Sequence, residues 1–272
     1  MPDGPGPPAL DAAAVQDELD LALALADACD ALTLPLFQAR SFTVDWKPNH
    51  TEVTEADRDA ETLVGELLRA ARPDHALSGE EHGLVGAEAS PWRWVVDPID
   101  GTSGFVRGIP VWATLLALTH AEHGLVVGVV SAPALGRRWW AGRGLGAFAD
   151  GRPCRVSTVD RLDEAQVCVT FSSGWDRLGL TDRLVELLQA ARRARGFGDF
   201  WQHALVAEGA VDVAVDAVGV APYDIAAVRL LVEEAGGRLT DRHGVPTHEH
   251  DTAISTNGIL HAEVIDRLGS RA

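Results

Sequence analysis

Short apolar runs bounded by glycine and proline follow one another through the middle of this 272-residue chain. They lie at residues 76–78, 92–96, 114–119, 125–131, 138–141 and 146–149. Runs of this length with turn residues between them are typical of neighbouring strands, and the pair Asp150-Gly151 is typical of a tight hairpin. The pattern therefore predicts a mostly antiparallel sheet in this part of the chain.

The last third of the chain has a different pattern, in which strand-like and helix-like segments alternate. The strand-like segments are residues 166–171, 211–215 and 253–256, and the helix-like segments are residues 181–194, 200–208, 224–235 and 258–268. Such alternation predicts a layered α/β arrangement. We expect an α+β lobe at 10–160 and an α/β lobe at 161–272, after a flexible arm at 1–9 that is rich in glycine and proline.

Two helices are expected before the first strand. Residues 10–40 carry apolar side chains at helical spacing, although Pro35 is expected to kink or end the helix. Residues 54–71 are expected to form the second helix, in which Thr54 and Asp57 have the spacing of a capping box.

Charge argues against several classes of partner. The chain has 23 Lys and Arg against 40 Asp and Glu, which gives a formal charge of −17. This acidity opposes binding to nucleic acid and to anionic membranes, because both depend on clustered Lys and Arg. A small ligand is favoured instead, and an anionic ligand would need metal ions or helix N-termini to hold it.

The cysteines and the N-terminus bear on cellular location. Cys29, Cys154 and Cys168 are odd in number and widely spaced, so we expect buried thiols in a reducing compartment rather than disulfides or a metal site. The sequence has no secretory signal and no apolar stretch long enough to span a bilayer. The expected location is the cytoplasm.

One apolar run ends in residues suited to both metal and phosphate. It delivers Asp97 and Asp100, and the Gly101 and Thr102 that follow suit a turn into a helix N-terminus. The two carboxylates, with the Ile99 carbonyl left free by an irregular turn, offer oxygen ligands to a hard divalent cation. Backbone N–H groups of the glycine and threonine would point at an incoming phosphate. Two aspartates at this spacing are, by themselves, more often a solvated turn.

Two further acidic positions strengthen the metal hypothesis. Glu80 and Glu81 follow a strand-like run, and Asp224 lies at the start of a helix, where the helix dipole stabilises its charge. Taken singly, these are more typical of a solvated surface pair and of a plain N-cap. Together with the aspartate pair they favour cation binding, because clustered carboxylates repel one another unless metal ions neutralise them.

Four motifs occur in the order and spacing of the inositol monophosphatase-like superfamily, which the chain resembles over most of its length. The motifs are Thr54-Glu-Ala-Asp57, Gly79-Glu80-Glu81, Asp97-Pro-Ile-Asp100-Gly101-Thr102 and Tyr223-Asp224-Ile-Ala-Ala. The resemblance implies an α/β (α+β) fold, a layered αβαβα sandwich of the inositol monophosphatase and sugar phosphatase type. It also implies Mg²⁺-dependent hydrolysis of a small phosphomonoester by a homodimer.

The resemblance also implies the metal ligands. Glu80, Asp97 and the Ile99 carbonyl would bind the first cation. Asp97, Asp100 and Asp224 would bind the second. Two cations bridged in this way would stabilise the attacking and the leaving oxygens of an in-line displacement. Mg²⁺ is the expected cofactor, with two or three ions bound, and Mn²⁺ is an alternative.

Catalytic roles follow from the same resemblance. Glu80 and Thr102 resemble the pair that orients the attacking water. Asp57 would support Thr102 or a weakly bound third ion, and Gly101 and Thr102 would bind phosphate through their backbone. The mechanism implied is direct attack of metal-activated water on phosphorus, so that no cysteine or serine nucleophile is required.

The sequence departs from the family pattern in two places. Tyr223 stands where tryptophan is usual before the C-terminal aspartate, and this exchange is expected to change packing more than metal binding. Ser103-Gly104 stands where relatives often have a polar pair including asparagine. Side-chain contacts there are expected to differ, while the backbone contacts to phosphate remain available.

The sequence Gly198-Asp199-Phe200-Trp201 resembles the histidinol-phosphate phosphatase branch of the superfamily, since inositol phosphatases tend to have small residues there. Histidinol phosphate carries an ammonium group and an imidazole, so its recognition favours a carboxylate and an aromatic wall. The candidate substrate-binding residues are Asp199, Phe200, Trp201, Asp216 and Arg107. Three have alternative roles, a helix cap for Asp199, core packing for Trp201 and a surface ion pair for Arg107.

The resemblance leaves three functions open. The leading one is a cytoplasmic Mg²⁺-dependent histidinol-phosphate phosphatase of histidine biosynthesis. Inositol monophosphate, fructose 1,6-bisphosphate and an adenosine bisphosphate are alternative substrates within the superfamily, and a catalytically silent metal-dependent regulator is a different class. Every expected ligand position holds a competent residue, which argues against the silent regulator.

His243, His248 and His250 lack zinc-site spacing and are expected to be solvated.

Overall fold

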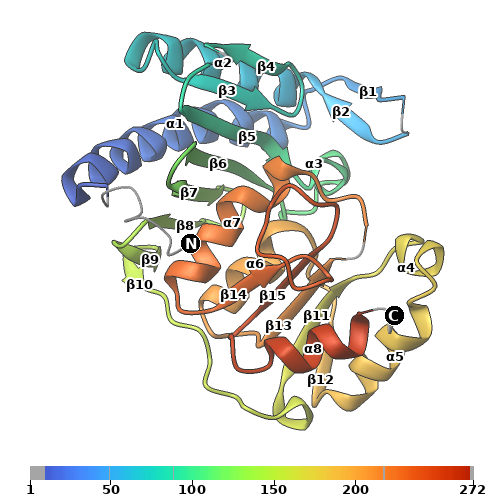
Figure 1. Cartoon of the computed structure of the whole chain (residues 1–272). Coiled ribbons are helices and arrows are strands. Elements are labelled where there is room, and N and C mark those ends of the chain that lie inside the picture. The colour runs from blue at the N-terminus through green and yellow to red at the C-terminus, as the bar shows by residue number, and fades with distance from the viewer. Residues whose placement is uncertain (1–9, 49, 88, 217, 270–272) are drawn as a thin grey trace.

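The computed structural model describes residues 10–269 except Asn49, Glu88 and Ala217, so the arm expected at residues 1–9 lies outside the described residues. The chain folds into five layers, helix on sheet on helix on sheet on helix (Figure 1). The helices of these layers are, in order, α1 (Ala12–Ala39) with α2 (Glu55–Ala71), α6 (Asp199–Ala207) with α7 (Pro222–Glu234), and α5 (Thr181–Ala190) with α8 (His261–Leu268). The layered αβαβα sandwich is therefore confirmed.

The large sheet has eight strands in the order β10-β9-β8-β7-β6-β5-β3-β4. Their bounds are β3 Ala76–Gly79, β4 Gly83–Gly86, β5 Trp92–Asp100, β6 Ala113–His120, β7 Gly124–Ala132, β8 Arg137–Gly142, β9 Gly146–Ala149 and β10 Arg152–Pro153. All neighbours are antiparallel except β3 and β5, which confirms the predicted sheet. Asp150 and Gly151 both have positive φ between β9 and β10, as a tight hairpin turn requires.

The outer helices behave largely as expected. Pro35 was expected to kink or end the first helix, and it does not end the helix, because α1 continues through it to Ala39. Proline removes only one backbone hydrogen bond from the interior of the helix, and the apolar face of α1 remains packed on the large sheet. The capping box of α2 is confirmed, since the backbone N–H of Thr54 donates to Asp57 Oδ2 at 2.8 Å.

The second sheet has five strands in the order β12-β11-β13-β15-β14. Their bounds are β11 Gln166–Thr170, β12 Arg193–Arg195, β13 Val213–Asp216, β14 Arg238–Thr240 and β15 Ala253–Thr256. The helix predicted at residues 181–194 ends at Ala190, and its last predicted residues belong to β12. The last buried apolar side chain of α5 is Leu187, whereas pairing with β11 gives the backbone of β12 its partners.

Several short elements were not predicted. The hairpin of β1 (Val44–Trp46) and β2 (Glu52–Thr54) lies beside the short helix α3 (Thr102–Arg107), as Figure 1 shows. A single-turn helix α4 (Gly174–Arg177) and a 3₁₀ turn at Leu162–Glu164 complete the fold. Strands of three residues carry too little periodicity to be recognised from sequence. The hairpin matters here because it borders the site described below.

The central layer is held to the large sheet by close backbone packing. Helix α7 crosses β7 at Gly128, where a Cβ atom would lie 2.7 Å from the Ala227 carbonyl oxygen. Only glycine permits this approach. The contact fixes α7, and the N-terminal turn of that helix, against the large sheet.

Among the described helices, none combines the length and the apolar content needed to cross a membrane.

Candidate metal centre and active site

The two aspartates of β5 can act together because the strand carries a bulge. Asp97 lies opposite Leu115 of β6 and Asp100 lies opposite Ala113, so β5 has one residue more than β6 over this stretch. In a regular strand, side chains three residues apart lie on opposite faces, and one inserted residue reverses this relation. The backbone N–H of Ile99 donates to Asp97 Oδ1 at 2.9 Å, which orients that carboxylate.

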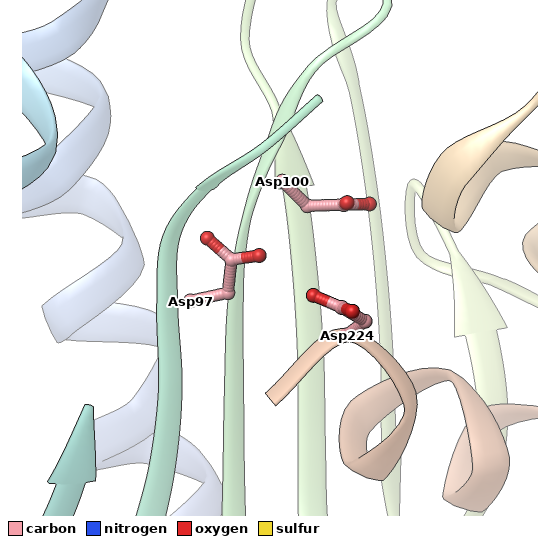
Figure 2. Close-up of side chains that lie close together, drawn as sticks. All are labelled: Asp97, Asp100 and Asp224. Carbon is pink, nitrogen blue, oxygen red and sulfur yellow. The ribbon is translucent and has the colours of Figure 1, made fainter. Parts of the chain in front are cut away.

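Asp224 comes from α7 and joins the two aspartates of β5. It lies in the first turn of α7, where the Ala221 backbone N–H donates to its Oδ2 at 2.7 Å. One carboxylate oxygen from each of Asp97, Asp100 and Asp224 lies within 4.8 Å of the other two. Figure 2 shows these side chains pointing toward one another from the end of β5 and the start of α7. We call these three residues the aspartate trio.

Burial makes the aspartate trio unfavourable as three free anions. Asp97 is 1% exposed and Asp100 is 9% exposed. Desolvation raises the pKa of both well above the usual aspartate value, and neighbouring carboxylates raise it further. Desolvation also raises the pKa of Asp224 to about 7. Crowded carboxylate oxygens are the donor set that suits a hard divalent cation, so these residues fit Mg²⁺.

The metal-free protein is expected to lose stability as the pH rises from roughly 4 to 7. In this window the folded state keeps protons on the aspartate trio that the unfolded chain has lost, so deprotonation destabilises the fold. A melting temperature lower by roughly 5 °C at pH 7.5 than at pH 5 is expected in chelator, since about 1 kcal/mol shifts the Tm of a chain of this size by about 2–4 °C. Thermal melts at several pH values with and without Mg²⁺ measure this effect. An equal decrease of melting temperature with pH in both buffers would contradict the prediction.

Glu80 lies beside the aspartate trio but is paired with a lysine. It follows β3, and its carboxylate is close enough to Asp97 to raise the pKa of that residue. Lys47, in the β1–β2 hairpin, places Nζ 2.8 Å from Glu80 Oε1 and 2.7 Å from Glu81 Oε1. A positive charge thus already lies next to the predicted metal ligand. No sequence pattern indicated Lys47, because its position depends on the unpredicted hairpin.

Thr102 and Asp57 form a pair, as the resemblance implied. The Thr102 hydroxyl lies 3.2 Å from Asp57 Oδ1 and 3.0 Å from the Ile99 carbonyl oxygen, which are the two acceptors for its proton. The Ile99 carbonyl was expected to be free, whereas here it faces the Thr102 hydroxyl and keeps a second lone pair. Asp57 is fully buried, and desolvation raises its pKa to about 6 despite two hydrogen bonds from Thr54.

A cavity of about 410 Å³ is lined by the predicted metal and phosphate residues and by two of the predicted catalytic residues, Glu80 and Thr102. Its lining includes the aspartate trio, Glu80, Ile99, Gly101 and Thr102. Gly101 has φ +84° and precedes α3, and a Cβ atom there would lie 2.9 Å from the Val111 carbonyl oxygen. Glycine is therefore required at this turn. The backbone N–H groups at the start of α3 lie in the same cavity wall as the carboxylates.

A second cavity of about 210 Å³ adjoins the first. The two share four lining residues, Asp100, Asp199, Gly219 and Asp224. The second is also lined by Asp216, His203, Thr170 and Ser172. A phosphate next to the aspartate trio would therefore place the rest of a small ester against a wall that carries two further carboxylates.

The structure separates the predicted substrate-binding residues. Asp199, Phe200 and Asp216 line the second cavity. Phe200 is nevertheless only 1% exposed with its ring packed in the central core, and its backbone N–H donates to Asp100 Oδ2 at 2.7 Å. Trp201 packs on the same core, with its ring 5.2 Å from that of Phe197. Arg107 is exposed and lies 3.4 Å from Glu52, so it forms the surface ion pair that was its alternative role.

Asp199 is not the cap of α6. It is the first helical residue, after Gly198 at the N-cap, and it has φ +49°. Aspartate, asparagine and glycine are the residues that tolerate this backbone conformation best. Its side chain is solvent-exposed at the boundary of the two cavities.

The predicted free cysteines are buried, and two histidines of the loop at residues 243–250 lie next to acidic side chains. His250 Nδ1 lies 2.8 Å from Asp241 Oδ2, and His248 Nε2 lies 3.1 Å from Glu249, with the His248 side chain only 12% exposed. The expectation of a solvated loop is therefore wrong for His248. Within the described residues, the aspartate trio is the only cluster of three metal-capable side chains at ligand distance.

The fold is that of a phosphatase family. The model of the inositol monophosphatase family matches residues 15–270, so the chain belongs to this family. It is 50% identical to the histidinol-phosphatase of Mycobacterium tuberculosis, over 93% of this chain and 98% of that protein. It is 44% identical to the histidinol-phosphatase of Streptomyces coelicolor, over 94% and 98% of the two chains.

A solved structure agrees with the sequence relatives. The extragenic suppressor protein suhB from Bartonella henselae superposes with a TM-score of 0.85 at 28% identity, over 94% of this chain and 100% of that one. The resemblance inferred from four motifs is thereby confirmed, and the chain is a phosphatase of this family.

Proposed function

We propose that the protein hydrolyses L-histidinol phosphate to L-histidinol and phosphate. The observation that carries the proposal is the second cavity, in which Asp199 and Asp216 face the space next to the metal centre. The substrate has an ammonium group and an imidazole N–H close to its phosphate, and carboxylates are suitable partners for both. An uncharged polyol would gain far less from two anionic side chains. The relatives named above support the same substrate.

Two divalent cations, Mg²⁺ or Mn²⁺, are proposed as the cofactor. Glu80, Asp97 and the Ile99 carbonyl would hold one ion, and the aspartate trio the other, with Asp97 shared. When bound, such ions lower the pKa of water and neutralise phosphate charge. A third ion beside Asp57 is not needed, because the Asp57 carboxylate is already used by Thr54 and Thr102.

The chain's own residues are proposed to orient the reaction. Thr102 donates its hydroxyl proton to Asp57 and accepts a hydrogen bond from the attacking water, and Glu80 takes up the water proton. The backbone N–H groups of Gly101 and Thr102 hold phosphate oxygens at the start of α3. As the bond from the water oxygen to phosphorus forms, the ester P–O bond on the opposite side breaks. The leaving oxygen takes a proton from solvent water and departs as the alcohol, and no covalent enzyme intermediate forms.

A panel of phosphate esters tests this function. Phosphate release is measured with histidinol phosphate, inositol 1-phosphate, fructose 1,6-bisphosphate and an adenosine bisphosphate, each in Mg²⁺ and in chelator. We expect kcat/KM for histidinol phosphate to exceed the others by about 100-fold, the equivalent of about 2.7 kcal/mol. A higher value for any other ester would refute the proposed substrate. Absence of Mg²⁺-dependent release from all of them would indicate a silent family member.

The Lys47→Met variant is expected to bind Mg²⁺ about 10-fold more tightly than the wild type, as measured by isothermal titration calorimetry. In the metal-free protein the Lys47 ammonium occupies Glu80 and repels an incoming cation. Arg58→Met is the matched control, because Arg58 pairs with exposed Asp45 outside the metal centre. Unchanged or weaker binding in the lysine variant would show that Lys47 does not compete with the ion.

We also propose a cytoplasmic homodimer that acts in histidine biosynthesis. The three buried, unpaired thiols suit a reducing compartment, and the family resemblance supports the dimer. Light scattering on the eluting protein measures the assembly, and a monomer at micromolar concentration would argue against it.

A further inference from the structure

His203 is buried at the wall of the second cavity and connects two sheet residues. It lies on α6 and is 1% exposed. Its Nε2 is 2.8 Å from Asp216 Oδ2, at the end of β13, and its Nδ1 is 2.7 Å from Ser255 Oγ, on β15. Neither His203 nor Ser255 belongs to a motif recognised in the sequence. The hydrogen-bond network Ser255–His203–Asp216 therefore needs a physical explanation.

The chemistry of the partners determines the direction of these hydrogen bonds. An ionised carboxylate only accepts, so Nε2 carries the proton and donates to Asp216 Oδ2. The other ring nitrogen, Nδ1, lies at hydrogen-bond distance from the Ser255 hydroxyl, which is able to donate or to accept. Since Ser255 is fully buried, this contact holds the ring in one orientation. The imidazole in turn fixes the carboxylate of Asp216.

Fixing one oxygen of Asp216 determines where the other is. Among the described residues, Oδ1 of Asp216 has no hydrogen-bond partner, and the side chain is 8% exposed. Asp216 lines the second cavity together with His203 and Asp199. The free oxygen is thus the part of this carboxylate that is left for a ligand. Other charged groups facing the cavity are Asp100 and Asp224, which belong to the metal centre.

We infer that His203 is a positioning residue for substrate specificity, which holds Asp216 so that its free oxygen accepts a hydrogen bond from the cationic end of the substrate. This inference rests on the proposed function. His203 does not touch the reacting atoms. Its removal should weaken the binding of a cationic ester while leaving the chemistry at phosphorus intact, and a merely structural role would not discriminate between substrates.

Two variants of His203 separate positioning from folding. His203→Phe keeps a ring but removes the donor, whereas His203→Gln keeps an N–H donor toward Asp216. For histidinol phosphate, we expect the phenylalanine variant to raise KM about 10-fold with kcat within about twofold of wild type, and the glutamine variant to stay within about threefold in KM. For glycerol phosphate, which has no cationic group, KM should change little in either variant. Thermal melts in Mg²⁺ verify that both variants are folded.

A double-mutant cycle with Asp216→Asn tests whether His203 acts through Asp216. The double variant with His203→Phe should have the same KM for histidinol phosphate as Asp216→Asn alone. Additive losses, a glutamine variant as impaired as the phenylalanine one, or equal losses on both esters would overturn the inference. If the wild type shows no preference for histidinol phosphate, the proposed function fails and this inference with it. If that preference is present and survives in His203→Phe, only the inference fails.

Discussion

Asp97→Asn is expected to reduce kcat by about 10³-fold or more, the equivalent of about 4 kcal/mol of transition-state stabilisation. Asp97 is the proposed shared ligand, and its carboxylate is oriented by the Ile99 backbone N–H within the bulge of β5. An amide has nearly the same shape but carries no charge to neutralise a cation. Steady-state phosphate release at saturating Mg²⁺ measures the loss.

The same variant should be more stable than the wild type in chelator. Removing one of three crowded, buried carboxylates relieves repulsion within the aspartate trio. Mg²⁺ should then raise the melting temperature of the wild type more than that of the variant, because it binds the native site more tightly. A variant with wild-type kcat, or one that Mg²⁺ stabilises as much as the wild type, would refute the role of Asp97.

Asp199→Asn is expected to lower kcat/KM for histidinol phosphate by about 10- to 150-fold, which corresponds to about 1.5–3 kcal/mol for a hydrogen bond to a charged group. The Asp199 carboxylate lies where the two cavities meet and would pair with the substrate ammonium. Glycerol phosphate, which lacks a cation, should be hydrolysed at nearly the wild-type rate. The ratio of the two specificity constants is the quantity to measure.

Asparagine is the appropriate replacement because of the backbone at this position. Asp199 has φ +49°, a conformation that asparagine tolerates and alanine does not. Alanine would therefore add backbone strain to the loss of charge, and the two effects on kcat/KM could not be separated. Equal losses on both substrates would instead indicate a structural injury at the start of α6, and the choice of an amine substrate would then depend on the family relatives.

Much of the fold could be predicted from local patterns. Six of the eight strands of the large sheet show apolar runs, whereas β4 and the two-residue β10 do not, and the turn at Asp150-Gly151 has a definite signature. The prediction failed where tertiary contacts decide the local structure. Pro35 remains inside a helix because the packed face of α1 continues past it. The three residues of β12 become a strand only because β11 lies beside them.

The same distinction applies to the site. The residues of the aspartate trio were identified because they occur in motifs, and the structure brings them within 4.8 Å of one another. Lys47 and His203 were missed because their roles depend on partners distant in sequence. Phe200 and Trp201 were nominated from a resemblance and from their aromatic side chains, and both pack on the central core, although Phe200 also lines the second cavity. Whether an aromatic side chain binds substrate or packs in the core depends on its exposure at the cavity wall, and a local sequence pattern does not predict that exposure.

The close contact of Gly128 with α7 has a consequence for how the protein is made. Asp97 and Asp100 leave the ribosome long before Asp224, so the nascent first lobe carries two crowded acids without the third. The aspartate trio is assembled only when α7 docks on β7 against this glycine. The complete aspartate trio is therefore available to a cation only after α7 has been synthesised and has packed on the large sheet, whereas Glu80, Asp97 and the Ile99 carbonyl all precede α7 in the chain.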